Sequence, residues 1–250
     1  MKYITESSNY DKNGRGASIG VGDMKPLDII KKYAPWFDMN EADIIFRGMY
    51  DKGDFYKIDP SSSTRVSANT SNYYTLLIDS FESWGEYPKR SNSIICGSSR
   101  IITKSYSYKF QKRDMYVVIP LVEDCEFSIA PVDDFWESFE NVNDELSIDT
   151  LMEFNLILTQ YFNVKETDTL IEIKDKINLK HGDMPDDYWT SFQNGIDKHG
   201  SVYEYFDYIF SPNLNGFVKI QYDNGTVLPK HRELWTDSEC LLVRASLLGY

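Results

Sequence analysis

The chain has 250 residues, of which 42% are hydrophobic and 15% aromatic, enough apolar material for a globular core. Its formal net charge of −13 argues against a broad basic footprint for duplex DNA or an anionic membrane, while leaving room for a small local basic patch. No apolar run reaches the ~18 residues of a membrane span, and the first twenty residues lack the apolar stretch of a signal peptide.

The number and spacing of the cysteines and histidines further restrict the kinds of active or metal site that the chain can form. The three cysteines (Cys96, Cys125 and Cys240) are odd in number and widely spaced, which predicts reduced thiols in a cytoplasmic protein. The three histidines share no short spacing and no Cys-x-x-Cys pair occurs, so we expect no metal site. No Gly-x-Ser-x-Gly elbow, kinase signature or dinucleotide fingerprint is present, and a cysteine nucleophile would need a histidine partner that sequence alone does not identify.

The first third of the chain alternates between helix and strand patterns. Residues 1–23 are polar and glycine-rich, which predicts a mobile segment. "KPLDIIKKYAPWF" has apolar residues at helical spacing and ends at Pro35, "ADIIFRGMY" is typical of a strand that leads into Arg47, and "GDFYKIDPSSSTRVSANTS" has the composition of a loop. "NYYTLLIDSFESW" predicts a helix that stops before Pro88.

The remaining chain predicts strands, a helical segment and then strands again. "SNSIICGSSR" indicates a short strand, and "MYVVIPLVEDCEFSIAP" indicates a pair of strands rich in β-branched and aromatic residues. "IDTLMEFNLILTQYF" carries a strong helical stripe. In "GFVKIQYDNGTVLPKHRELWTDSECLLV", an Asn224-Gly225 turn between alternating residues predicts a hairpin, followed by a further strand.

These patterns predict an α+β fold in four parts. Residues 1–23 form the mobile segment, 24–132 the first part of the core, 133–210 a helical insertion, and 211–250 the last strands.

Two acids stand directly before the last apolar run, "CLLV". In a strand, Asp237 and Glu239 would share one face, and Glu239 would border the core. Such a pair is either a solvated edge that protects the strand from aggregation or a catalytic pair.

Three segments together carry a family resemblance: "IIFRGM", "SIICGSSRIITKSY" and "DSECLLV". In this order they resemble the mono-ADP-ribosyltransferases of the Arg-Ser-Glu type, which include bacterial toxins and phage-encoded enzymes. The resemblance implies a split β-sheet core, NAD as substrate, and ADP-ribose transfer to a macromolecule. The helical insertion would then stand before the last strands.

The resemblance assigns a role to each matching residue. Arg47, with Gly48 beside it, would bind the NAD phosphates; Ser98 or Ser99 would fill the serine motif, with Ser93 as an alternative because "CGSS" departs from Ser-Thr-Ser. Glu239 would be the catalytic carboxylate. Asp237 would activate the acceptor, although the family usually has Glu or Gln there.

One further arginine and four tyrosines are candidates for contacts with NAD. Arg65 precedes a predicted helix and so is a candidate phosphate contact, and Tyr106 is a candidate aromatic wall for nicotinamide, as are Tyr73, Tyr74 and Tyr108.

The implied chemistry is physically consistent. Arginine grips phosphate oxygens with a planar fork. A carboxylate near the ribose stabilises the oxocarbenium-like centre that forms when the nicotinamide bond breaks. Each residue also has a purely structural interpretation: Arg47 as an ion-pair partner, the serines as turn residues, and the acids as a solvated edge.

The sequence therefore predicts a cytoplasmic mono-ADP-ribosyltransferase, active in its own or a host cell. Its acceptor would be a protein or a nucleic acid, and an inhibitory partner such as an antitoxin is conceivable for this class. The alternatives are a non-enzymatic phage structural or interaction protein on the same fold, and an NAD glycohydrolase.

Overall fold

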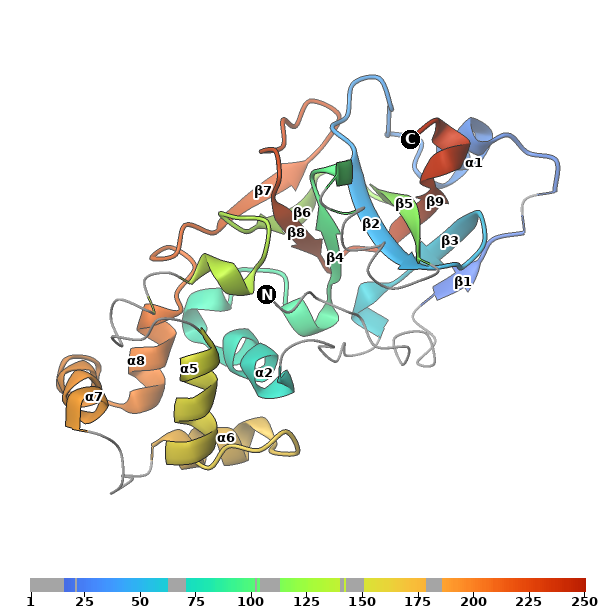
Figure 1. The fold of residues 1–250 in the computed structure, drawn as a ribbon. Helices are drawn as coiled ribbons and strands as arrows, with labels where there is room; N and C mark the ends of the chain where they lie inside the picture. Colours follow the sequence, from blue (N-terminus) through green and yellow to red (C-terminus); the bar gives the residue numbers. More distant parts are fainter. Residues whose placement is uncertain are drawn as a thin grey trace. The chain divides into compact units, whose positions relative to one another are not determined.

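The computed structural model describes residues 16–20, 22–62, 71–101, 103, 113–139, 142, 151–178 and 186–250 (Figure 1). The chain divides into two compact units, each built from separate stretches of sequence. The first comprises Met1–Asn69, Tyr87–Asp133 and Lys219–Tyr250, and the second Thr70–Glu86 and Asp134–Val218. A large antiparallel sheet and separate helices confirm the α+β class.

The first unit is built on the sheet. Across the described residues the sheet has nine strands in the order β1-β3-β9-β5-β2-β4-β8-β6-β7, and the pairs with a defined register are antiparallel. The strands are β1 (Gly16–Ser18), β2 (Ile45–Tyr50), β3 (Phe55–Ile58), β4 (Ile94–Gly97), β5 (Arg113–Pro120), β6 (Cys125–Ile129), β7 (Val218–Tyr222), β8 (Glu233–Thr236) and β9 (Cys240–Arg244).

The sheet cannot be flat, because β8 and β9 are joined by only three residues. Four strand spacings separate these strands in the sheet order, which is about 19 Å on a flat sheet. The connection from Thr236 to Cys240 reaches at most about 14 Å. The sheet must therefore bend sharply between β9 and β8.

Several strand pairs lie between β9 and β8 in the sheet order, and the one with the fewest paired residues is β2 with β4. The two strands are paired at Phe46 and Gly97, whereas β2 pairs with β5 along its whole length. We therefore place the bend between β2 and β4, where it divides the sheet into two halves.

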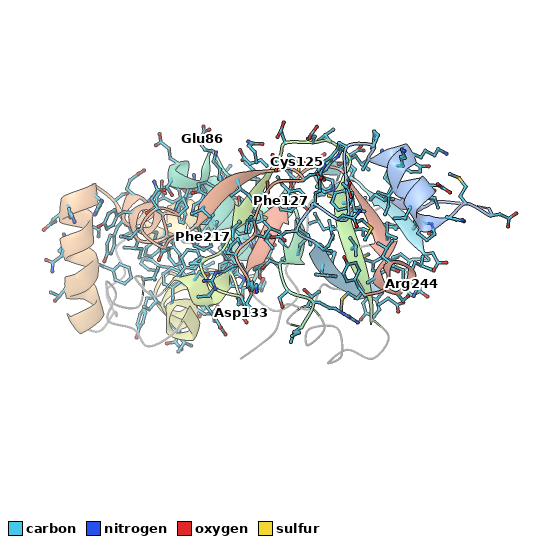
Figure 2. All side chains as sticks on the ribbon, turned by 90° about the horizontal axis from the view of Figure 1, so that it is seen from above. Glu86, Cys125, Phe127, Asp133, Phe217 and Arg244 are labelled. Carbon is cyan, nitrogen blue, oxygen red and sulfur yellow. The ribbon has the colours of Figure 1, made fainter. Side chains whose placement is uncertain are left out.

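The centre of the first unit is apolar on both faces of the sheet. Consecutive residues of β5 and of β9 are fully buried, so neither face of these strands is open to water. Helix α1 (Pro26–Tyr33) adds Ile29 and Ile30 to this core and ends before Pro35. Cys125 and Phe127, two residues apart on β6, belong to the same core (Figure 2).

Two sequence predictions about strands are wrong. Residues 55–58 lie in the predicted loop but form β3, because Phe55 and Ile58 become buried when this segment pairs with β9. The Asn224-Gly225 turn does not close a hairpin, since β6 lies between β7 and β8; instead the Asn224 side chain donates to the Trp36 carbonyl.

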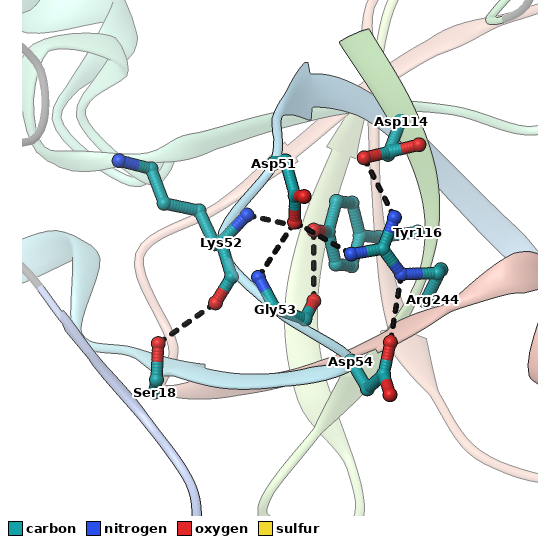
Figure 3. A network of polar contacts seen from close by, with 8 residues as sticks. All are labelled: Ser18, Asp51, Lys52, Gly53, Asp54, Asp114, Tyr116 and Arg244. Carbon is teal, nitrogen blue, oxygen red and sulfur yellow. Dashed lines mark hydrogen bonds and ion pairs between the residues drawn. The ribbon is translucent and has the colours of Figure 1, made fainter.

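An arginine at the end of β9 holds the β2–β3 loop in place (Figure 3). Arg244 contacts Asp51 at 2.5 Å, Asp54 at 2.9 Å and Asp114 at 2.7 Å. Asp51 also accepts a hydrogen bond from the Gly53 backbone. This backbone bond and then the Arg244 guanidinium hold the pKa of Asp51 below its usual value.

The second unit is helical. Its helices are α2 (Asn72–Ser80), α5 (Leu151–Leu156), α6 (Leu170–Ile177), α7 (Asp186–His199) and α8 (Val202–Ile209), and α5 continues as a π-helical turn over Ile157–Tyr161. The predicted stripe on α5 is buried at Phe154, Ile157 and Leu158.

Aromatic rings fill the core of this unit. Phe154 lies 5.0 Å from Phe210 and 5.1 Å from Phe206 between ring centroids, and Trp84 lies 5.0 Å from Phe217. Such offset and edge-to-face contacts stabilise a core beyond its buried area. Among the described residues, no helix is both long and apolar enough to cross a bilayer.

Close approach of α7 and α8 requires a glycine. A Cβ on Gly195 would come within 2.5 Å of the Tyr205 ring. We expect Gly195→Ala to destabilise the protein, because overpacking costs about 1–3 kcal/mol and outweighs the gain of about 1 kcal/mol from replacing glycine in a helix. Asn194→Ala, at the exposed neighbouring position, is the control and should be neutral or stabilising. Urea unfolding measures both, and equal stability of the two variants would contradict the packing argument.

The Asp51 contacts predict a pH dependence. Because the pKa of Asp51 is lowered from 3.8 by folding, its contribution to stability is present above 3.8 and is lost as the pH falls through the lower folded value. We expect Asp51→Asn to lower the melting temperature near neutral pH, and the difference from the parent protein to shrink below 3.8. A difference that stays constant down to the acid limit would argue against this role.

Candidate functional site

Arg47 lies at the bend of the sheet. Its side chain is 2% exposed, and its Nη1 donates to the Ile95 carbonyl on β4. β4 is paired with β2 at Phe46 and Gly97, and the two strands separate beyond this pair. The Ile95 carbonyl lies in the part of β4 that has separated. The Arg47 guanidinium thus enters the opening between β2 and β4. There it donates a hydrogen bond to the Ile95 carbonyl, which the pairing of β2 with β4 does not use.

The serine segment follows the end of β4. The Ser98 hydroxyl donates to the Pro229 carbonyl at 2.6 Å and accepts from the Arg232 backbone at 3.0 Å, so Ser98 fixes the loop before β8. The Ser99 carbonyl accepts from the Thr103 backbone and hydroxyl, which begins a tight turn. Ser93, the alternative, is buried and donates to Lys89.

The two acids expected at the start of a strand lie in the β8–β9 connection instead. β9 begins at Cys240, and Ser238 bends the chain by donating from its backbone to the Thr236 hydroxyl. The expected shared strand face of Asp237 and Glu239 is therefore wrong. Glu239 is about half exposed and forms an ion pair with Lys57 at 3.0 Å.

The strand register separates Arg47 from Glu239. Arg47 pairs with Tyr116, and Tyr116 pairs with Arg244, so Arg47 lies level with the far end of β9. Glu239 precedes the near end of that strand, which is about 17 Å away along the strand direction at ~3.3 Å per residue. The two backbone positions are therefore offset along the strands, although the Arg47 guanidinium lies close enough to the Cys240 thiol, next to Glu239, to lower the pKa of that thiol.

A different acid lies beside Arg47 and Ser98 in the register. Glu233, the first residue of β8, pairs with Gly97, which pairs with Phe46. The strand that carries Arg47 (β2), the strand that leads into Ser98 (β4) and the strand that begins with Glu233 (β8) are therefore consecutive in the sheet. Glu233 shares the face of Phe46, whereas Arg47 points into the opening between β2 and β4.

Glu233 is part of a buried ion pair. Arg90, at the start of the 3-10 turn Arg90–Asn92, contacts it at 2.6 Å, and the two side chains are 2% and 6% exposed. The Arg90 guanidinium also lies over the Trp235 ring, whose indole donates to the Pro88 carbonyl. Sequence analysis missed this pair, although "HREL" places an acid directly before an apolar strand just as "DSEC" does.

The other candidate residues fall in several places. Gly48 follows Arg47 on β2 and pairs with Met115 on β5. Arg65, Tyr106 and Tyr108 lie outside the described residues. Tyr73 and Tyr74 are buried among the aromatic rings of the helical unit, and burial raises the pKa of both.

Buried thiols near Arg47 are unsuited to nucleophilic chemistry. Burial raises the pKa of Cys125 to about 12. Burial also raises the pKa of Cys240, and the neighbouring thiols of Cys96 and Cys125 raise it further, although Arg47 lowers it in part. Protonated thiols are poor nucleophiles. No group of metal-binding side chains occurs within the part of the chain that the structure describes.

No protein-family model, curated protein or solved structure matches this chain.

The buried ion pair predicts a large stability effect. We expect Arg90→Met to lower the free energy of unfolding by about 3–5 kcal/mol, because it removes the cation that compensates the buried Glu233 carboxylate. Urea unfolding followed by tryptophan fluorescence measures the loss.

The double variant Arg90→Met/Glu233→Leu is the matched control, since it removes both charges and should recover much of the loss. A loss below about 1 kcal/mol in the single variant would mean that water or another group solvates Glu233.

Proposed function

We propose that this protein is an NAD-dependent mono-ADP-ribosyltransferase that acts on a macromolecular acceptor. The observation that carries the proposal is the succession of three neighbouring strands that bear Arg47, the Gly97-Ser98-Ser99 segment and Glu233. These are the residue types that the sequence resemblance requires, and the strands that carry them are neighbours in the sheet. The divided sheet agrees with the split core that the resemblance implies.

The proposed roles follow from charge and geometry. Arg47 is assigned the pyrophosphate of NAD, because its planar fork binds two phosphate oxygens at once. Its side chain is 2% exposed, so this binding requires β2 and β4 to open further around it. A carboxylate near the ribose stabilises the positive charge that develops on it as nicotinamide leaves. Ser98 fixes the loop that leads into Glu233.

Two carboxylates compete for the catalytic role. The sequence motif favours Glu239, with Asp237 beside it, whereas the strand register favours Glu233. Glu239 is accessible and bound only loosely to Lys57, since an exposed ion pair contributes little to stability. Glu233 is held rigidly by Arg90, as a preorganised catalytic group must be.

Glutamine substitution separates the two acids. If Glu233 is catalytic, Glu233→Gln should reduce label transfer from NAD to lysate macromolecules at least a hundredfold, because the nearly isosteric amide lacks the charge. Glu239→Gln, the matched control, should then keep activity within about threefold. The reverse pattern would assign the role to Glu239.

Stability must be controlled, because Glu233→Gln removes the buried ion pair with Arg90. Activity is therefore measured well below the melting temperature of each variant, and Glu233→Asp serves as a second variant that keeps the charge. If neither labelled macromolecules nor free nicotinamide appears with the parent protein, and NAD produces no thermal shift, the enzyme proposal fails in favour of a non-enzymatic interaction protein. Release of nicotinamide without a labelled acceptor would identify an NAD glycohydrolase.

A further inference from the structure

Ser98 brings two positively charged segments together. Its hydroxyl and backbone bind the loop Pro229–Arg232, so the residues that follow β4 and those that precede β8 form one surface. We call this surface the cationic surface and define it by Arg100, Lys230, His231 and Arg232. The first three side chains are exposed and the fourth is half-buried.

The cations of this surface have no acidic partner among the residues that the structure describes. Within the described residues, no carboxylate forms an ion pair with Arg100, Lys230 or Arg232, whereas Lys57, Lys219 and Arg244 each contact an acid. In a chain of net charge −13, these cations are brought to one place by the Ser98 bonds. Such a group creates a confined positive potential that attracts an anionic ligand.

The backbone of the loop is held in an uncommon conformation. His231 has a φ of 59°, in the left-handed region that non-glycine residues rarely adopt. The two Ser98 bonds, to Pro229 and to Arg232, enclose this residue and fix it there. Strained conformations of this kind persist where the surroundings hold them, and they are frequent at ligand-binding sites.

Apolar side chains flank the same surface. Val227 is 86% exposed and Ile101 is 75% exposed, the two highest values among the exposed large hydrophobic residues that the structure describes. Ile101 follows Arg100 directly, and Val227 lies just before the loop. The ligand therefore offers apolar contact as well as negative charge.

We infer that the cationic surface binds a single-stranded nucleic acid. A polynucleotide strand supplies a phosphate at every nucleotide for Arg100, Lys230 and Arg232, and it supplies base faces for Ile101 and Val227. A single strand suits a protein of strong negative charge better than a duplex does, because it has a lower charge density. The inference rests on the proposed function only in making this strand the acceptor, and the binding itself is tested without NAD.

The test measures fluorescence anisotropy of a labelled single-stranded oligonucleotide of about 12 nucleotides, titrated with protein at several salt concentrations. In Arg100→Gln/Lys230→Gln, the slope of log affinity against log salt should fall by about 1.4, because each lost phosphate contact removes ~0.7. Lys25→Gln/Lys31→Gln is the matched control: both lysines are exposed, and the change in net charge is the same. This control should keep the parent slope.

Three results would overturn the inference. The first is no binding at low salt; the second is equal weakening in both double variants, which would reflect net charge alone. The third is displacement of the oligonucleotide by an acidic peptide, or by free NAD, at matched charge concentration. Such displacement would mean that the surface binds a peptide or a free nucleotide. Label transfer from NAD to lysate protein in the same preparation would show that the enzyme proposal survives a failure of strand binding.

Discussion

The three-residue connection between β8 and β9 is the constraint on which the first unit depends. A chain that leaves one half of the sheet and enters the other within so short a distance forces the sheet to bend. The bend limits the β2–β4 pairing to one position and leaves a carbonyl that the Arg47 side chain satisfies. Thus the feature that separates the two halves also determines where the charged side chains can meet.

The burial of Arg47, Arg90 and Glu233 follows from this geometry. Charged side chains enter a protein interior only where hydrogen bonds or opposite charges compensate for lost hydration. The first arginine contacts a backbone carbonyl, and the second contacts Glu233. The proposed catalytic site and the structural ion pair therefore concern the same part of the sheet. There, a backbone carbonyl and an opposite charge compensate for charged groups that an unbroken apolar sheet would exclude.

Local patterns were sufficient for much of the fold. The helix before Pro35 and the strand that contains Arg47 follow from periodicity and from proline, and both are confirmed. The residues of β3 lack a strong pattern of their own and become a strand only through pairing with β9. The role of Glu233 could not be predicted, because its partner Arg90 is distant in sequence and because two similar acid-before-strand motifs follow one another within seven residues.

The strand order also constrains how the chain acquires its fold. β8 lies between β4 and β6, and β9 lies between β3 and β5, so these two strands, which follow the other seven described strands in the sequence, are internal to the two halves. Until residues 233–244 are synthesised, four inner strands have an unpaired edge, and such edges pair readily with other chains. Folding of the first unit therefore depends on long-range pairing, and the nascent chain is most exposed to aggregation before residues 233–244 are synthesised.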